Sequence, residues 1–164
     1  MSIEAFAGRD VVTRRVTRET DAEGFASIRD RIEAGLEWGV GGLVEDAGGR
    51  VLFVREGDSY EDATWKLPGG GVEAGEHREA AVIREVQEET GVTVAVDELL
   101  AVSEVTVVND GRSAQFHFGT YRATPEGTAL TDDPGVGDEG IVEVAWKESI
   151  PDAALDADLL RRVR

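Results

Sequence analysis

One stretch, from Gly70 to Val92, constrains the fold of this chain more than any other. Its sequence is GGVEAGEHREAAVIREVQEETGV. Residues 76–90 contain neither Gly nor Pro and favour helix, and Gly91 is a natural stop at the C-terminal end. The stretch therefore predicts a glycine-rich turn that leads directly into one helix over residues 76–90.

Three carboxylates share one face of this predicted helix. At ~100° per residue, Glu85, Glu88 and Glu89 fall within one ~100° arc. Because nothing basic follows at i+4, we expect bare repulsion among them to work against the helix. A hard divalent cation such as Mg²⁺ or Mn²⁺ would relieve the repulsion, since it takes oxygen ligands from a few carboxylates and from substrate phosphates. A solvated acidic face is the alternative interpretation.

The spacing of the whole stretch resembles the Nudix box. Gly70 is followed after five residues by Glu76 and, after seven more, by REVQEETGV at residues 84–92. The approach WKLPGG, residues 65–70, is also similar to that family. The resemblance implies a Nudix α/β/α sandwich with a mixed sheet. It also implies a hydrolase that uses Mg²⁺ or Mn²⁺ to cleave the pyrophosphate linkage of a nucleoside diphosphate derivative, of nucleoside triphosphate or nucleotide sugar type.

The resemblance also implies roles for individual residues in the helix. Glu85, Glu88 and Glu89 would be the metal ligands, and Arg84 would orient a carboxylate or contact a phosphate at the catalytic centre. The general base is left open by the pattern. Glu139, in the loop before the last predicted strand, is the leading candidate, and Glu88 itself could hold or activate the water. Further candidates in or beside that loop are Asp133, Asp138 and Glu143.

Residues around the start of the box have expected supporting roles. Gly70 is a backbone requirement near the substrate, because glycine allows positive φ and lets the backbone approach a metal or phosphate closely. Lys66 could reach a substrate phosphate, with a solvated lysine as the alternative. Glu76 projects away from the acidic face by helical arithmetic, so we expect it to organise the loop and the helix start.

Composition narrows the class of partner. The 164 residues include 34 acidic and 17 basic ones, a net charge of -17, and the basic ones are all Arg except Lys66 and Lys147. A phosphate backbone requires positive surface, so general nucleic-acid binding is not expected. This charge excess is what a protein working in concentrated salt would show, which favours a halophilic source over an ordinary acidic enzyme.

The chain contains no cysteine, so disulfides and thiolate chemistry are excluded. The N-terminus lacks a basic region with an apolar run, and no stretch approaches the ~20 apolar residues of a membrane span. A cytoplasmic protein without membrane contact is expected.

We expect a 1–35 extension ahead of a Nudix domain at 36–164. Residues 9–19 could form a strand or a mobile arm. Thr20 and Glu23 have the spacing of a capping box, and Phe25, Ile28, Ile32 and Leu36 then follow at helical spacing. This short helix is predicted to pack on the domain or to contribute to a homodimer interface.

The remaining elements are predicted from alternation and turn signals. Residues 46–49 predict a hairpin that pairs the strands around them, and Asn109-Asp110-Gly111 predicts a second tight turn. In the strand after that turn, Gln115, His117 and Tyr121 could line a substrate pocket or face solvent. The other predicted elements are strands over 93–108, 113–123 and 141–146 and a helix over 151–164.

Two functions outside hydrolysis fit parts of the pattern. A Nudix-fold domain that senses a nucleotide or binds a protein without turnover is one, although such domains can lose box residues that are intact here. An acidic Ca²⁺-binding module is the other, but nothing resembles an EF-hand loop. The identity of the nucleotide derivative is not determined, because loops outside the box govern it.

Overall fold

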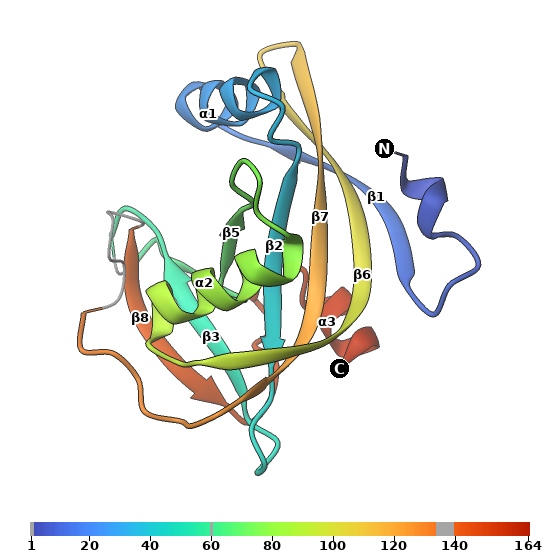
Figure 1. Ribbon diagram of the computed structural model, residues 1–164. Helices are drawn as coiled ribbons and strands as arrows, with labels where there is room; N and C mark the ends of the chain where they lie inside the picture. The colour runs from blue at the N-terminus through green and yellow to red at the C-terminus, as the bar shows by residue number, and fades with distance from the viewer. Residues whose placement is uncertain (1, 60, 134–139) are drawn as a thin grey trace.

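The computed structural model describes residues 2–59, 61–133 and 140–164 (Figure 1). Two sheets and three α-helices account for most of these residues, together with a 3-10 turn near the N-terminus. In chain order the elements are η1 (Ile3–Phe6), β1 (Val12–Glu19), α1 (Ala22–Glu33), β2 (Trp38–Val44), β3 (Val51–Glu56), β4 (Thr64–Lys66), β5 (Gly69–Gly71), α2 (Arg78–Thr90), β6 (Val94–Asn109), β7 (Arg112–Pro125), β8 (Ile141–Lys147) and α3 (Ala157–Val163).

The larger sheet is mixed, as predicted. Its strands lie in the order β1-β6-β7-β2-β5, with β1 parallel to β6, β2 parallel to β7, and antiparallel pairing elsewhere. The smaller sheet is antiparallel, in the order β4-β3-β8. Helix α2 packs in a core cluster that contains buried residues of both sheets, so the fold is α/β with this helix between the sheets (Figure 1).

Glycines of β2 allow close packing on both faces of the larger sheet. A Cβ at Gly42 would lie 3.1–3.2 Å from Val86 and Val82 of α2. A Cβ at Gly41, on the opposite face, would lie 3.0 Å from the ring of Phe118. Phe118 belongs to the apolar cluster on which α1 packs. Therefore α2 covers one face of the sheet, and α1 covers the other.

The predicted hairpin around residues 46–49 is wrong. The turn exists, since Asp46 N donates to the Arg50 carbonyl at 2.9 Å, but β2 and β3 then enter different sheets. They share only an isolated bridge between Glu45 and Val51 among the described residues. Strand β2 pairs with β7 and, at Gly39–Gly41, with β5, whereas β3 pairs with β4 and β8 in the smaller sheet.

The second predicted hairpin is confirmed. Asn109 of β6 pairs with Arg112 of β7, and the two turn residues Asp110 and Gly111 have φ of 49° and 76°. Positive φ at both positions is the geometry that suits the twist of a two-residue hairpin. The β6–β7 ladder has register shifts between Val96 and Glu98 and between Leu99 and Ala101.

The N-terminal segment is ordered against the larger sheet. Residues 12–19 form strand β1 and pair with β6, so the strand interpretation holds over the mobile arm. Helix α1 is capped by Asp21 rather than by Thr20, because the Asp21 Oδ1 accepts a hydrogen bond from Gly24 N at 2.7 Å. Phe25 of α1 is buried in a cluster with residues of β6 and β7. The helix is therefore packed on the chain's own sheet.

The two other helices are shorter than predicted. Helix α2 begins at Arg78, so Glu76 lies in the preceding loop. Residues 151–156 form turns, closed by a hydrogen bond from Ala154 N to the Pro151 carbonyl, and Asp156 has a left-handed φ of 60°. Helix α3 can therefore begin only at Ala157. Within the described ranges, no helix is long and apolar enough to cross a membrane.

Candidate active site

Arg84 is the centre of a charged network on α2. Its Nε and Nη2 donate to the two carboxylate oxygens of Glu76 at 2.8 and 2.9 Å. Its Nη1 donates to Glu85 Oε1 at 2.8 Å and to Glu88 Oε2 at 3.4 Å. The expectation of unrelieved repulsion among the box carboxylates was wrong, because the neutralising cation precedes them in sequence instead of following at i+4.

Glu76 ties the loop before α2 to the helix. Besides its two bonds to Arg84, its Oε1 accepts a hydrogen bond from Glu73 N at 3.1 Å. The hydrogen bonds from Arg84 hold the pKa of Glu76 below its usual value, and Glu76 with Glu85 raises the pKa of Arg84. The helical arithmetic that placed Glu76 away from this network was wrong, since the residue is not in the helix.

Two buried carboxylates lie against the glycine strand β5. Glu89 is 1% exposed, and its Oε1 accepts a hydrogen bond from Gly69 N at 2.8 Å. Glu85 is 5% exposed, and a Cβ at Gly70 would lie 2.6 Å from its carboxyl carbon. None of Gly69–Gly71 has a positive φ. The glycines are therefore required for close approach, and the expected positive φ was wrong.

The NUDIX domain model matches residues 35–157. The chain belongs to the Nudix family. A MutT-like protein of Streptomyces ambofaciens is 48% identical over 67 residues, which cover 41% of this chain and 42% of that protein. An RNA pyrophosphohydrolase of Dinoroseobacter shibae is 45% identical over 62 residues, 38% of each chain.

A solved Nudix structure supports the fold. The crystal structure of a MutT protein from Bacillus halodurans matches with a TM-score of 0.61 at 25% identity, covering 78% of this chain and 80% of that one. The matched segments nevertheless span less than half the length of the two relatives from Streptomyces and Dinoroseobacter. The family match over residues 35–157 shows the family, and the crystal structure supports the fold.

Nudix hydrolases generally use divalent metal ions, and the donors on α2 suit them in chemistry. Glu85, Glu88 and Glu89 offer only oxygen ligands, which Mg²⁺ and Mn²⁺ prefer. In the described part of the chain, no three Asp, Glu or His side chains lie close enough together to bind one metal ion as they stand. The Glu88 side chain is 38% exposed and faces Arg84. Glu85 and Glu89 are thus the two buried carboxylates of the set, and Arg84 would share both Glu85 and Glu88 with a bound cation.

Lys66 is half-buried and ion-paired. Its Nζ lies 2.7 Å from Glu56 Oε2, so a carboxylate already offsets its charge. The residue also lines a cavity of roughly 100 Å³ that Gly70 shares. Its expected contact with a substrate phosphate would have to compete with Glu56.

The candidate bases fall into two groups. Glu139 and Asp138 lie outside the described residues. Of the others, Glu143 is half-buried with its Oε1 3.8 Å from Arg55 Nη1, whereas Asp133 is exposed. The start of the loop is fixed beside the box helix, because Thr131 N donates to the Thr90 carbonyl at 2.8 Å.

For Gln115, His117 and Tyr121 of β7 the sequence left pocket lining or solvent exposure open, and the structure buries two of them. His117 and Tyr121 are buried, and His117 stacks on Trp38 with ring centroids 5.1 Å apart. Burial lowers the pKa of His117 and raises that of Tyr121. Gln115 alone of the three is exposed.

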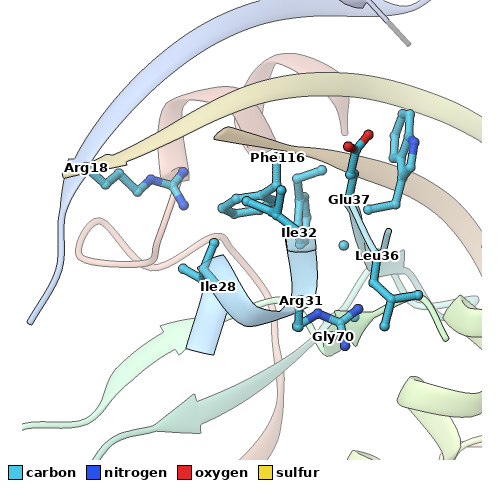
Figure 2. Close-up of a pocket in the computed structure, with 12 residues that line it drawn as sticks. Arg18, Ile28, Arg31, Ile32, Leu36, Glu37, Gly70 and Phe116 are labelled. Carbon is cyan, nitrogen blue, oxygen red and sulfur yellow. The ribbon is translucent and has the colours of Figure 1, made fainter. Parts of the chain in front are cut away.

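The alternate residues of β7, Phe116 and Phe118, line a cavity instead (Figure 2). From sequence, Phe116 and Phe118 had no assigned role, and the helix with Ile28 and Ile32 was predicted to pack on the domain or to contribute to a homodimer interface. The apolar residues of α1 at helical spacing were the only sign in the sequence that this helix faces the sheet. Periodicity cannot reveal that α1 covers this face incompletely.

Proposed function

We propose that the chain is a metal-dependent pyrophosphohydrolase that cleaves the phosphoanhydride linkage of a nucleoside diphosphate derivative. The observation that carries the proposal is the arrangement around α2. Arg84 gathers Glu76, Glu85 and Glu88, while Glu85 and Glu89 are buried against the bare backbone of β5. Buried carboxylates held beside an accessible backbone edge suit cation and phosphate binding better than they suit a solvated face.

Each residue of this arrangement has a proposed part in the reaction. Glu85, Glu88 and Glu89 would hold the cation, with Arg84 beside Glu85 and Glu88. When bound, a divalent cation neutralises phosphoryl charge and lowers the pKa of water. Arg84 orients Glu85 and supplies positive charge beside the carboxylates, while Gly70 lets the substrate phosphates approach without a side chain in the way.

The base is proposed to be Glu139 or Glu88. The fixed start of its loop beside the end of α2 supports Glu139, and the partial exposure of Glu88 next to Arg84 supports the alternative. Turnover measured against Mg²⁺ concentration separates them. A base variant should lower kcat far more than metal affinity, so Glu139→Gln and Glu88→Gln should differ. A near-normal kcat in Glu139→Gln, with loss in Glu88→Gln, would place the base in the box.

Several finer assignments belong to this proposal. Mg²⁺ or Mn²⁺ is the expected cation, and the substrate is a small nucleotide, because the net charge of -17 disfavours a long nucleic acid. The same charge supports a salt-rich cytoplasm as the working environment. A homodimer and the division of the chain at residue 35 remain predictions.

The test is a substrate screen with the full chain. Nucleoside triphosphates, nucleotide sugars and dinucleotides are incubated with Mg²⁺ and with Mn²⁺, and release of mononucleotide, pyrophosphate or phosphate is measured. We expect release from at least one class and none in EDTA. Nucleotide binding without any release would favour the alternative, a non-catalytic nucleotide-sensing or protein-binding domain.

A further inference from the structure

A cavity of roughly 210 Å³ opens between α1 and the larger sheet, beside the glycine strand β5 (Figure 2). Its walls are mostly apolar. Ile28 and Ile32 of α1 lie on one side, and Phe116 and Phe118 of β7 lie on the other. Gly70 and Gly71 form the end of the cavity next to the box.

A large part of this wall lies outside the matched family domain. The family match begins at residue 35, whereas four lining residues precede it: Arg18, Ile28, Arg31 and Ile32. The Nudix domain by itself would leave Phe116 and Phe118 open on this side. The preceding segment therefore converts an aromatic surface into an enclosed pocket.

The size and walls of the pocket suit one flat ring system. Clefts that hold whole drug-sized ligands measure about 300–1,000 Å³, so this cavity accommodates only part of a nucleotide. A heterocyclic base can stack on an aromatic face such as that of Phe116, and its edges tolerate aliphatic walls. A phosphate group, by contrast, would be desolvated among such side chains at high cost.

Arg31 places a positive charge at the end of the pocket nearest the box. Its Nη2 donates to the Val72 carbonyl at 2.9 Å, and a Cβ at Gly71 would lie 2.3 Å from that nitrogen. In the described part of the chain, no carboxylate lies within 4 Å of its guanidinium. In a protein of net charge -17, this is a suitable contact for an anion.

Strand β5 lies between the pocket and the buried Glu85 carboxylate. Gly70 lines the pocket, and a Cβ added to it would lie 2.6 Å from the Glu85 carboxyl carbon, whereas a Cβ added to its neighbour Gly71 would lie 2.3 Å from Arg31 Nη2. A ligand with its base in the pocket would thus carry its phosphates past Arg31 and over the edge strand toward Glu85.

We propose that the segment ahead of the family domain, β1 and α1, completes a binding pocket for the nucleobase, and that Arg31 contacts the adjacent phosphate. This assignment rests on the proposed function for the chemistry at the carboxylates. It makes α1 a determinant of substrate affinity.

Binding without turnover tests the base pocket. Calorimetry in EDTA compares AMP, GMP, CMP and UMP with ribose 5-phosphate, which lacks a base. We expect at least one mononucleotide to bind about tenfold or more tightly than ribose 5-phosphate. Equal binding of the two, or no binding of any mononucleotide, would overturn the pocket assignment.

Filling the pocket gives a sharper result than emptying it. Ile32→Phe should lower the affinity for the tightest-binding mononucleotide about tenfold. The variant's affinity for ribose 5-phosphate and its melting temperature should stay near those of wild type. Ile32→Ser provides a second variant, with circular dichroism as the check on folding. The matched control is Ile83→Phe on α2, whose side chain is 38% exposed and does not line the pocket. Wild-type mononucleotide affinity in Ile32→Phe would disprove the proposal.

Arg31 is tested by a different signature. Arg31→Gln should weaken mononucleotide and ribose 5-phosphate by the same factor, about 10- to 100-fold, because both carry the phosphate. Arg31→Lys should recover most of that loss. Unequal losses, or no rescue by lysine, would show a role in holding the loop at Val72 instead.

The two proposals fail separately. Glu85→Gln should bind mononucleotides like wild type in EDTA but lose hydrolysis. If Glu85→Gln hydrolyses normally, the proposed function fails whatever the pocket does. If hydrolysis depends on Glu85 while Ile32→Phe leaves binding and KM unchanged, only the pocket assignment fails.

Discussion

Helices α1 and α2 cover opposite faces of the same sheet and meet its edge strand β5 in different ways. From α2, Glu85 and Glu89 reach β5 as buried charges that Arg84 and the Gly69 amide stabilise. From α1, the contact is mainly apolar, with one arginine at the end of the cavity. The difference shows that one short strand can separate a cluster of buried charged side chains on one face from an apolar cavity on the other.

Neighbouring glycines show this difference within a single strand. A Cβ at Gly70 would meet the Glu85 carboxylate, and a Cβ at Gly71 would meet the Arg31 guanidinium. The Glu85 carboxylate near Gly70 belongs to the network in which Arg84 also bonds to Glu76 and Glu88. The Arg31 guanidinium near Gly71 is the far end of a flexible side chain, which can move. Changes on the α2 side should therefore affect chemistry, and changes on the α1 side should affect binding.

The largest expected effect is on the α2 side. Glu85→Gln or Glu89→Gln should lower kcat by roughly 100-fold or more, because each removes a charge that would hold the cation. Both amides keep an oxygen acceptor, so we expect a cooperative melting transition close to that of wild type. Turnover at limiting Mg²⁺ measures the effect. Unchanged kcat in either variant would show that this carboxylate of α2 is not needed for turnover, and the contrast between the two helices would fail.

The glycine pair should give the next largest effect. Gly70→Ala should lower kcat by about tenfold or more, because the new methyl group displaces the Glu85 carboxylate from β5. Gly71→Ala should raise KM with little change in kcat, because Arg31 can move aside. Steady-state kinetics on the same substrate distinguish the two. Equal changes in both parameters for both variants would show that β5 does not divide the site.

Removing the carboxylate before α2 should have a smaller effect, on stability. Glu76→Gln loses a charge-assisted bond pair to Arg84 and should reduce the free energy of unfolding at pH 7 by about 1–2 kcal/mol. The folded-state pKa of Glu76 lies below its unfolded value of about 4.5. The stabilisation is therefore present above pH 4.5 and is lost as the pH falls through the folded-state pKa.

Urea unfolding at several pH values checks this prediction. The difference between wild type and Glu76→Gln should shrink steadily below pH 4.5. A matched control is Glu79→Gln, an exposed acid in the first turn of the same helix. A difference that grows in acid would mean that the Arg84–Glu76 pair does not stabilise the fold.

The smallest expected effect concerns the exposed charge of the whole molecule. Molar KCl should screen the net charge of -17 and stabilise the fold by about 1 kcal/mol, or ~2–4 °C in melting temperature. The Arg84 network is largely shielded from solvent and should be less sensitive to screening. Melting curves in KCl of wild type and Glu76→Gln should therefore rise in parallel. A flat response in wild type would contradict adaptation to salt.

The sequence by itself determined the elements whose cause is local. The helix that carries Glu85 and Glu89 follows from a run without Gly or Pro and from a glycine stop, and α2 ends at Thr90 as predicted. The Asn109-Asp110-Gly111 turn follows from positive φ at two adjacent residues. The spacing of the box was likewise enough to predict the family and the mixed sheet.

Only the tertiary structure decided what lies opposite each element. Glu76 reaches Arg84 because the loop that carries Glu76 folds back onto α2, a contact that no helical spacing contains. Strands β2 and β3 enter different sheets because β2 pairs with β7 and β5, whereas β3 pairs with β4 and β8. The apolar stripe of α1 gave the same signal whether it filled the core or walled a pocket. Periodicity records which face of an element is buried, whereas long-range packing decides what that face meets.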